Sequence, residues 1–216
     1  MNVPACQKQA VGGTRWGHTR EGEHTVGGSP LPTLIVVSGP PTTGKTTLAH
    51  EIARVVGCPA ICRDEIKEGM VHATPGFEPG PADEVSMRTL PTFFGVLELL
   101  LKSGVTTVAE AAFQDRLWRP GLEPLRKIAR IRVVHCMVDA NVALERKRRR
   151  FEGNPLRRAH EKAPQDNAPQ DDAVAHASNH SAFNRVSMDV PWIEVDTTEG
   201  YAPALKDIAA FVNGAD

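Results

Sequence analysis

The stretch from Gly39 to Thr46 constrains the fold of this chain more than any other, because it fits G-x-x-x-x-G-K-[ST] at every fixed position. Glycines let a backbone turn so that successive N–H groups point at phosphate oxygens, and a following helix adds its positive N-terminal end. The short apolar run 34–38 precedes this loop, and residues 45–56 carry apolar side chains at helical spacing after it. This context predicts a phosphate-binding loop between a buried strand and a helix.

The loop residues have separate expected roles in binding ATP and Mg²⁺. Lys45 is expected to reach the β- and γ-phosphates, and the Thr46 hydroxyl to ligate Mg²⁺. Thr47 offers a second hydroxyl of lesser rank. The residues expected at the nucleotide are Gly39, Pro40, Pro41, Thr42, Thr43, Gly44, Lys45, Thr46 and Thr47. A Gly-rich turn that matches by chance is disfavoured by the strand before the motif and the helix after it.

Short apolar runs alternate with amphipathic segments along the chain, which predicts an α/β fold with a mostly parallel sheet flanked by helices. Strands are expected at residues 34–38, 60–63, 106–109, 131–138 and 191–196. Helices are expected at residues 45–56, 82–102, 120–129, 141–150 and 201–212. Pro91 should kink or restart the second of these helices, because proline removes a backbone donor.

Two stretches lack this alternation. Residues 1–32 are rich in Gly, Thr, His and charge, which is typical of a flexible tail, although a partner chain could order them. Residues 151–185 are polar with few large apolar side chains, which favours a mobile lid. A single P-loop kinase-like domain is therefore expected over residues 33–216.

Composition limits the expected surroundings and partners. The net charge of −1 argues against a protein that grips a long nucleic acid, since such proteins usually carry a basic excess. No run approaches the roughly 18 apolar residues of a membrane span, and the start lacks the apolar segment of a signal peptide. The four cysteines form no paired C-x-x-C pattern, and Cys58 and Cys62 are expected as buried or half-buried thiols in preference to a redox or metal role. A cytoplasmic location follows as the expectation.

A carboxylate follows the second expected strand. Asp64 stands at its end between Arg63 and Glu65, with Lys67 further on. At that edge of a parallel sheet the Asp64 carboxylate can accept a proton from a hydroxyl that attacks the γ-phosphate. Arg63 and Lys67 could hold an anionic acceptor. A solvated charged loop explains these residues equally well from the local sequence alone.

The phosphate loop, followed about twenty residues later by Arg63-Asp64-x-x-Lys67, resembles the polynucleotide-kinase-like group of P-loop kinases. Relatives of this group include chloramphenicol phosphotransferase and zeta-toxin-like kinases. The resemblance covers residues 34–212 and implies a P-loop nucleoside triphosphate hydrolase fold with five parallel strands. It implies that Asp64 is the general base and that Lys67 helps to bind the acceptor.

The third expected strand ends in Glu110, where the resembling group more often has an aspartate beside its metal. Asp115 lies five residues further on. Either carboxylate could hold a Mg²⁺-bound water, and either could simply cap a helix or loop. The second carboxylate of the metal site is therefore open between these two residues, and Glu110 is the one expected to organise Mg²⁺ together with Thr46.

Five consecutive cations, from Arg146 to Arg150, end the fourth expected helix. Cations are favourable at a helix C-terminus, so a solvated helix end is one interpretation. The resemblance implies another, in which a lid arginine stabilises charge on the transferring phosphoryl group. It places such residues near Arg146 and Arg150, with Arg157 or Arg158 further on. We expect at least one of these arginines to act, and the sequence does not distinguish them.

Two further pairs of residues carry weaker signals. Thr197 and Thr198 follow the last expected strand, where the resemblance implies a loop near the adenine, although the same residues could cap the final helix. His176 and His180 are spaced to share a helix face, but two histidines alone make a poor metal site, which favours a polar lid surface.

Together these patterns predict an ATP- and Mg²⁺-dependent kinase that phosphorylates a hydroxyl of a small molecule or nucleotide. One alternative keeps the enzyme but takes a polynucleotide 5′-hydroxyl as acceptor, which a basic, aromatic-lined groove would favour. A second alternative is a nucleotide-binding module or slow ATPase, for which Asp64 would be dispensable and Lys45 still needed.

Overall fold

The computed structural model describes residues 25–26, 29–78, 83–153 and 182–214, and for residues 25–26, 29, 148 and 150–153 it describes the backbone alone. The chain divides into two units, Met1–Pro30 and Leu31–Asp216. Within the first unit, β1 (Thr25–Val26) pairs antiparallel with β2 (Ser29–Pro30). The predicted site residues all belong to the second unit.

The second unit is built on a five-stranded sheet with the order β4-β5-β3-β6-β7, and every neighbouring pair is parallel. The predicted α/β class with a parallel sheet is confirmed. The strands are β3 (Thr33–Ser38), β4 (Ala60–Cys62), β5 (Thr107–Glu110), β6 (Arg130–Met137) and β7 (Trp192–Asp196). The strand that leads into the phosphate loop, β3, lies in the centre, where both of its faces are buried.

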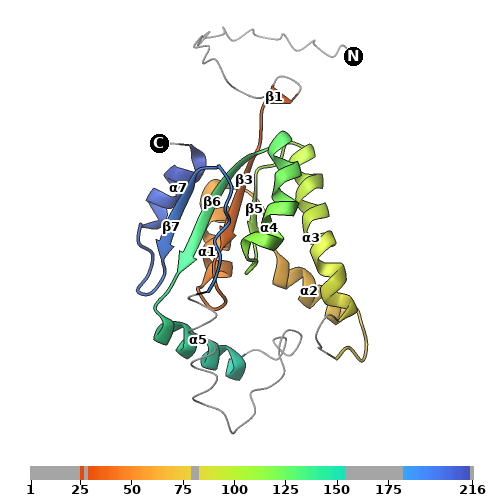
Figure 1. Cartoon of the computed structure of the whole chain (residues 1–216), viewed down its shortest axis with the longest axis vertical. Helices are drawn as coiled ribbons and strands as arrows, with labels where there is room; N and C mark the ends of the chain where they lie inside the picture. Colours follow the sequence, from red (N-terminus) through yellow and green to blue (C-terminus); the bar gives the residue numbers. More distant parts are fainter. Residues whose placement is uncertain (1–24, 27–28, 79–82, 154–181, 215–216) are drawn as a thin grey trace, which may run out of the picture. The chain divides into compact units, whose positions relative to one another are not determined.

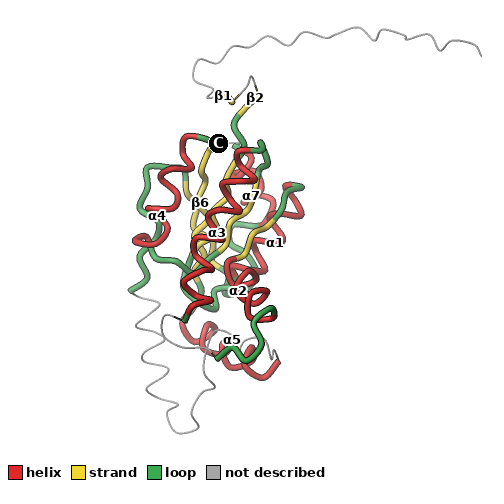
Figure 2. The backbone as a smooth tube through the Cα atoms, turned by 90° about the vertical axis from the view of Figure 1, so that its right-hand side faces the viewer, coloured by secondary structure: helices red, strands yellow, loops and turns green. Residues whose placement is uncertain are grey.

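Helices cover both faces of this sheet (Figures 1 and 2). The central strand divides its side chains between two cores, since Ile35 and Val37 face one layer of helices and Leu34 and Val36 face the other. The first layer holds α1 (Lys45–Val56) and α7 (Leu205–Asn213). The second holds α3 (Glu84–Lys102), α4 (Asp115–Leu122) and the 3₁₀ helix η1 (Glu123–Lys127).

Three helices differ from the sequence prediction. A short helix, α2 (Arg63–His72), follows β4 directly, where no helix was expected. The helix α3 runs through Pro91 without restarting. The expected helix 120–129 is instead α4 followed by η1, because Pro124 has no N–H to bond back to the carbonyl one turn earlier.

The carboxyl ends of the strands meet at one edge of the sheet, and α5 (Ala140–Gly153) lies beyond them (Figure 1). At this edge Glu110 of β5 is the Cα partner of Val37 in β3 and of Cys62 in β4. The phosphate loop, the third-strand acid and the second-strand acid are therefore neighbours. Within the parts of the chain that are described, every helix is too short or too polar to cross a membrane.

Candidate active site

The phosphate loop is wedged between α1 and the neighbouring strand β6. Gly39 has φ +145°, and a Cβ there would lie 2.3 Å from the carbonyl oxygen of Cys136. Gly44 caps α1 in the left-handed conformation with φ 75°. Thr42 also has a positive φ, 65°. Alternation of this kind turns backbone N–H groups toward one point, as an anion-binding nest requires.

The two prolines of the loop act through their carbonyl groups, since proline has no N–H to offer a phosphate. The carbonyl oxygen of Pro40 accepts hydrogen bonds from the Lys45 ammonium at 2.7 Å and from the Thr43 hydroxyl at 3.0 Å. Lys45 is only 5% exposed. The loop thus holds its lysine inward, and its backbone N–H groups are the donors that a nest of this kind offers to phosphate.

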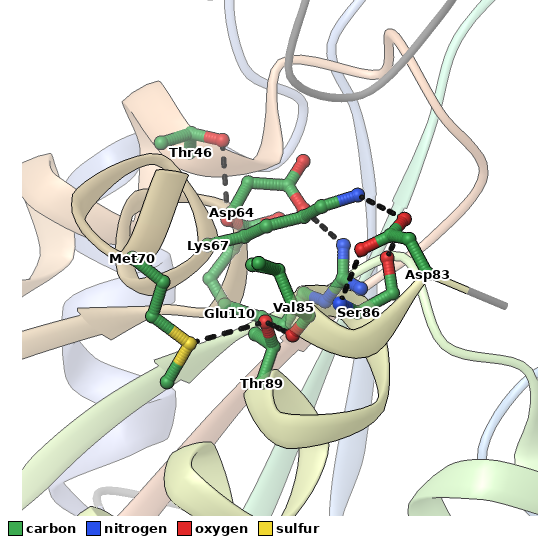
Figure 3. Close-up of polar contacts among 10 residues, drawn as sticks. Thr46, Asp64, Lys67, Met70, Asp83, Val85, Ser86, Thr89 and Glu110 are labelled. Atoms are coloured by element: carbon green, nitrogen blue, oxygen red, sulfur yellow. Dashed lines mark hydrogen bonds and ion pairs between the residues drawn. The ribbon is translucent and has the colours of Figure 1, made fainter. Parts of the chain in front are cut away.

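Two oxygen ligands suitable for Mg²⁺ lie side by side below the loop. The Thr46 hydroxyl donates to Glu110 Oε2 at 3.1 Å, across 64 residues of sequence (Figure 3). Hydroxyl and carboxylate oxygens are the hard donors that Mg²⁺ prefers, and it usually takes one or two protein ligands and keeps several waters. The residues present therefore fit the ion. Thr47 is exposed on α1, away from this pair.

Burial dominates the electrostatics of Glu110, whose side chain lies almost entirely inside the protein. Burial raises the pKa of Glu110 above 4.5, because it penalises the charged form, although the Lys45 ammonium opposes that rise. The nearby Asp64 and Glu65 carboxylates raise it further. A bound cation would relieve this crowding of negative charge.

Of the two carboxylates left open by the sequence, Asp115 has other partners. It forms an ion pair with Arg119 one turn along α4 and accepts the N–H of Ser187 at 2.7 Å. The hydrogen bond from Arg119 lowers the pKa of Asp115, with the Ser187 N–H adding to the effect. Asp115 therefore ties α4 to the segment before β7, and Glu110 is the acid beside Thr46.

Asp64 lies in the first turn of α2, two residues after β4, and not in an open loop. Its carboxylate, which Figure 3 shows, is 43% exposed and pairs with Arg63 Nη1 at 2.9 Å. The Arg63 Nε atom is buried and has no hydrogen-bond partner among the described residues. An accessible carboxylate whose position is fixed by a guanidinium can accept a proton from an approaching hydroxyl group.

Lys67 has a partner that the sequence analysis missed. Its ammonium lies 3.5 Å from Asp83 Oδ2, and the two side chains are 5% and 10% exposed. Asp83 also caps α3, since its Oδ1 accepts the Ser86 N–H at 2.7 Å (Figure 3). The signal available in the sequence was an aspartate at the start of an expected helix, which is a frequent N-cap. Lys67 thus joins α2 to α3 through a largely buried charge pair.

Arg146 joins the phosphate loop to the end of β7. Its Nη2 donates to the carbonyl oxygens of Thr197 at 2.6 Å and Thr198 at 3.3 Å, and its Nη1 lies 3.3 Å from the Thr197 hydroxyl. That hydroxyl is also 2.7 Å from the carbonyl oxygen of Thr43 within the loop. Of the other lid candidates, the Arg150 side chain falls outside what the structure describes. The same holds for Arg157, Arg158, His176, His180 and most of the expected lid 151–185.

The structure brings most of the predicted residues to one sheet edge. Lys45 and Thr46 begin α1, Glu110 ends β5, Asp64 begins α2, and Arg146 approaches from α5. This edge offers backbone donors and a cation for phosphates, hard oxygens for a metal and an accessible carboxylate. Such a set can position and stabilise a phosphoryl group, which is most of what its transfer requires.

Several solved structures share this fold. A candidate kinase from Chloroflexus aurantiacus gives a TM-score of 0.72 at 23% identity, over 86% of this chain and 99% of that one. A gluconokinase from Sinorhizobium meliloti gives 0.54 at 17% identity, over 85% and 93% of the two chains. The APS kinase of Mycobacterium tuberculosis, solved with AMPPNP and APS, gives 0.54 at 12% identity, over 86% and 100%. These likenesses confirm the predicted P-loop nucleoside triphosphate hydrolase fold.

At the level of sequence, no curated protein matches the chain. A family model does match, over residues 34–169, and its description is an AAA domain. The matched region is more than half of the chain and contains the phosphate loop, Asp64, Glu110 and Arg146. The chain therefore belongs to the AAA domain family.

Proposed function

We propose that this protein is an ATP-dependent phosphotransferase that moves the γ-phosphate of ATP to a hydroxyl of a small molecule or nucleotide. One observation carries the proposal. The Thr46–Glu110 pair lies at the mouth of the phosphate loop, and Asp64 follows the strand residue that is the Cα partner of Glu110. Nucleotide-binding groups and an accessible carboxylate thus share one sheet edge, which a nucleotide-binding module alone would not need.

The phosphate loop provides the nucleotide-binding part of the proposed site. The N–H groups from Thr42 to Thr46 and the Lys45 ammonium bind the phosphates, and Lys45 exchanges its 2.7 Å contact with Pro40 for a phosphate oxygen. Thr46 and Glu110 would hold Mg²⁺ directly or through water. When bound, the ion neutralises charge on the β- and γ-phosphate oxygens.

The helix α2 provides the part of the proposed site that would bind the acceptor. As the acceptor oxygen forms its bond to the γ-phosphorus, the bond from that phosphorus to the leaving ADP oxygen breaks, and Asp64 takes the acceptor proton. Arg63 fixes the Asp64 carboxylate at 2.9 Å. Lys67, one turn along α2, adds positive charge to the same side while Asp83 holds it.

Arg146 supports the loop from the opposite side. A Cβ placed on Gly44 would be 3.8 Å from Arg146 Nη1, so the guanidinium lies against the N-terminal end of α1. In that place it stabilises negative charge on the phosphates as they rearrange. The fold shared with gluconokinase and APS kinase supports phosphotransfer, since both of those proteins are kinases by name.

The test measures ADP release from ATP·Mg²⁺ across a panel of nucleosides, sugars, aminoglycosides, chloramphenicol and a 5′-hydroxyl oligonucleotide. Wild type is compared with Asp64→Asn, and Asp207→Asn on the exposed start of α7 is the matched control. We expect one acceptor class to stimulate release. Asp64→Asn should lower that stimulation by about 10²–10⁴-fold, the usual contribution of a general base, with ATP affinity nearly unchanged.

The possible outcomes separate the hypotheses. Stimulation by the oligonucleotide alone would move the acceptor to a polynucleotide end. Stimulation that survives in Asp64→Asn would remove Asp64 from its role as base. A flat panel with equal basal hydrolysis in all three proteins would refute phosphotransfer and favour a nucleotide-binding module.

A further inference from the structure

A second cluster of ligand-type side chains lies beside the candidate active site. His50 Nε2 is 2.7 Å from Glu65 Oε1 and 3.7 Å from Cys62 Sγ. The three side chains come from α1, the end of β4 and the first turn of α2, and their ligand atoms all lie within 4.8 Å of one another. None of the three has a role in the phosphotransfer proposed above.

The spacing of these atoms suits tetrahedral zinc. With Zn–S of about 2.3 Å and Zn–N of about 2.0–2.1 Å, tetrahedral angles place sulfur and nitrogen about 3.6 Å apart. The observed separation of Cys62 and His50 is 3.7 Å. The same geometry requires about 3.3 Å between nitrogen and carboxylate oxygen, against 2.7 Å for His50 and Glu65. These two side chains are 45% and 48% exposed, so they can separate by the remaining distance.

Electrostatics at the cluster favour a cation. Burial raises the pKa of the Cys62 thiol well above its usual range, and the Glu110, Glu65 and Asp64 carboxylates raise it further. The carboxylates that disfavour a thiolate attract a divalent ion, and a coordinating ion deprotonates a thiol outright. A bound ion would offset the negative charge of these carboxylates and of the thiolate that it holds.

We propose that His50, Cys62 and Glu65 form a binding site for one Zn²⁺ ion, with the fourth tetrahedral position left to water. Thiolate and imidazole select a borderline-soft metal, whereas the all-oxygen pair Thr46 and Glu110 suits Mg²⁺. The two sites thus discriminate between the ions by ligand chemistry.

The position of this site gives zinc a structural consequence. His50 lies one turn after Thr46 on α1, and Glu65 is next to Asp64 on α2. An ion held by all three ligands links the helix of the nucleotide loop to the element that carries Asp64. Zinc should therefore raise the thermal stability of the protein in the absence of ATP. This inference does not depend on phosphotransfer, because its ligands and its readouts are separate from that reaction.

The test uses the full chain, reduced and metal-free, titrated with Co²⁺ as a spectroscopic probe and then with Zn²⁺ in competition. Cobalt bound by a thiolate shows a sulfur-to-metal charge-transfer band, which other histidines or carboxylates of the chain cannot produce. The variants are Cys62→Ser, His50→Gln and Glu65→Gln. Cys58→Ser, on a cysteine outside the cluster, and His72→Gln, at the exposed end of α2, are the matched controls.

We expect the band in wild type, Cys58→Ser and His72→Gln, and its loss in Cys62→Ser. His50→Gln should weaken zinc binding by at least about 100-fold, since loss of an outer-shell partner alone typically costs about 10–100-fold. Circular dichroism checks that each variant is folded. If Cys62→Ser does not fold, His50→Gln and Glu65→Gln decide the matter. The absence of the band in folded wild type would overturn the site. A band and a zinc affinity that neither His50→Gln nor Glu65→Gln changes would overturn it as well.

Discussion

The close approach of Gly39 to β6 allows a quantitative prediction for Gly39→Ala. The added Cβ would start 2.3 Å from the Cys136 carbonyl oxygen, whereas real Cβ atoms essentially never come within 3.0 Å of such an atom. The loop and β6 must therefore separate by at least the difference between these distances, and both are buried. The φ of +145° adds backbone strain of its own.

Steric overlap and backbone strain together set the expected loss of unfolding free energy in Gly39→Ala. Backbone in a sparsely populated region costs about 1–3 kcal/mol, and forcing extra atoms into packed structure costs about 1–3 kcal/mol more. Alanine also reduces the conformational freedom of the unfolded chain, which offsets about 0.4–1 kcal/mol of this loss. Gly39→Ala should therefore lower the free energy of unfolding by about 1–6 kcal/mol, and it should weaken ATP·Mg²⁺ binding because the loop is displaced.

Two other glycines separate the contributions. Gly57 has a φ of +78° with no atom within 4 Å of the added Cβ, so Gly57→Ala measures the backbone term alone. Gly69 lies inside α2 with equally open space, and Gly69→Ala should stabilise the protein by about 0.5–1 kcal/mol. Urea unfolding followed by circular dichroism, without nucleotide, gives the three free energies. A Gly39→Ala loss no greater than that of Gly57→Ala would refute the argument from steric overlap.

Three further changes test the site. Lys45→Ala should abolish detectable ATP·Mg²⁺ binding by calorimetry and stop turnover, and unchanged turnover would remove the phosphate-loop assignment. Glu110→Gln should stop turnover yet stabilise the metal-free protein at neutral pH. The pKa of Glu110 is raised above 4.5 in the folded protein. Protonated Glu110 therefore favours folding below pH 4.5, and this contribution to the free energy of unfolding is lost as the pH rises through the folded-state pKa. The gain in unfolding free energy should therefore vanish near pH 4, and a gain independent of pH would contradict this reasoning. Asp83→Ala should cost about 3–5 kcal/mol in urea unfolding by leaving Lys67 buried without its partner, and a loss under about 1 kcal/mol would show that the pair is not buried in solution.

The sequence predicted best what is contiguous in the chain. The loop from Gly39 to Thr46 is one unbroken segment whose chemistry is fixed by residue type, so its place between β3 and α1 was predictable. Apolar runs predicted all five strands, because strands of a parallel sheet covered by helices carry apolar side chains. Even the edge strand β7, where only Val195 is buried, keeps enough of them to be recognised. The helix α2 escaped prediction for the converse reason. Its one buried residue is Lys67, so it shows no apolar stripe at helical spacing.

The contacts that the sequence could not fix join residues far apart in the chain. Thr197 reaches Thr43 across 154 residues, and Thr46 reaches Glu110 across 64. Such pairs depend on strand order, which sequence periodicity does not supply. The choice between Glu110 and Asp115 illustrates this limit, since both were acids after the same strand. Only the register of β5 beside β3 places the first of them at Thr46.

The long-range contacts explain how a short loop can hold a shape suited to phosphate. The Cys136 carbonyl group lies against Gly39. The Thr197 hydroxyl donates a hydrogen bond to the Thr43 carbonyl oxygen, and the Thr46 hydroxyl donates one to Glu110. These partners come from β6, the end of β7 and β5, so three strands restrain one loop. A loop restrained in this way loses little conformational freedom when a nucleotide binds, and its donors need little reorganisation as charge develops on the phosphates. The motif supplies the donors, and the order of the parallel strands supplies their fixed positions.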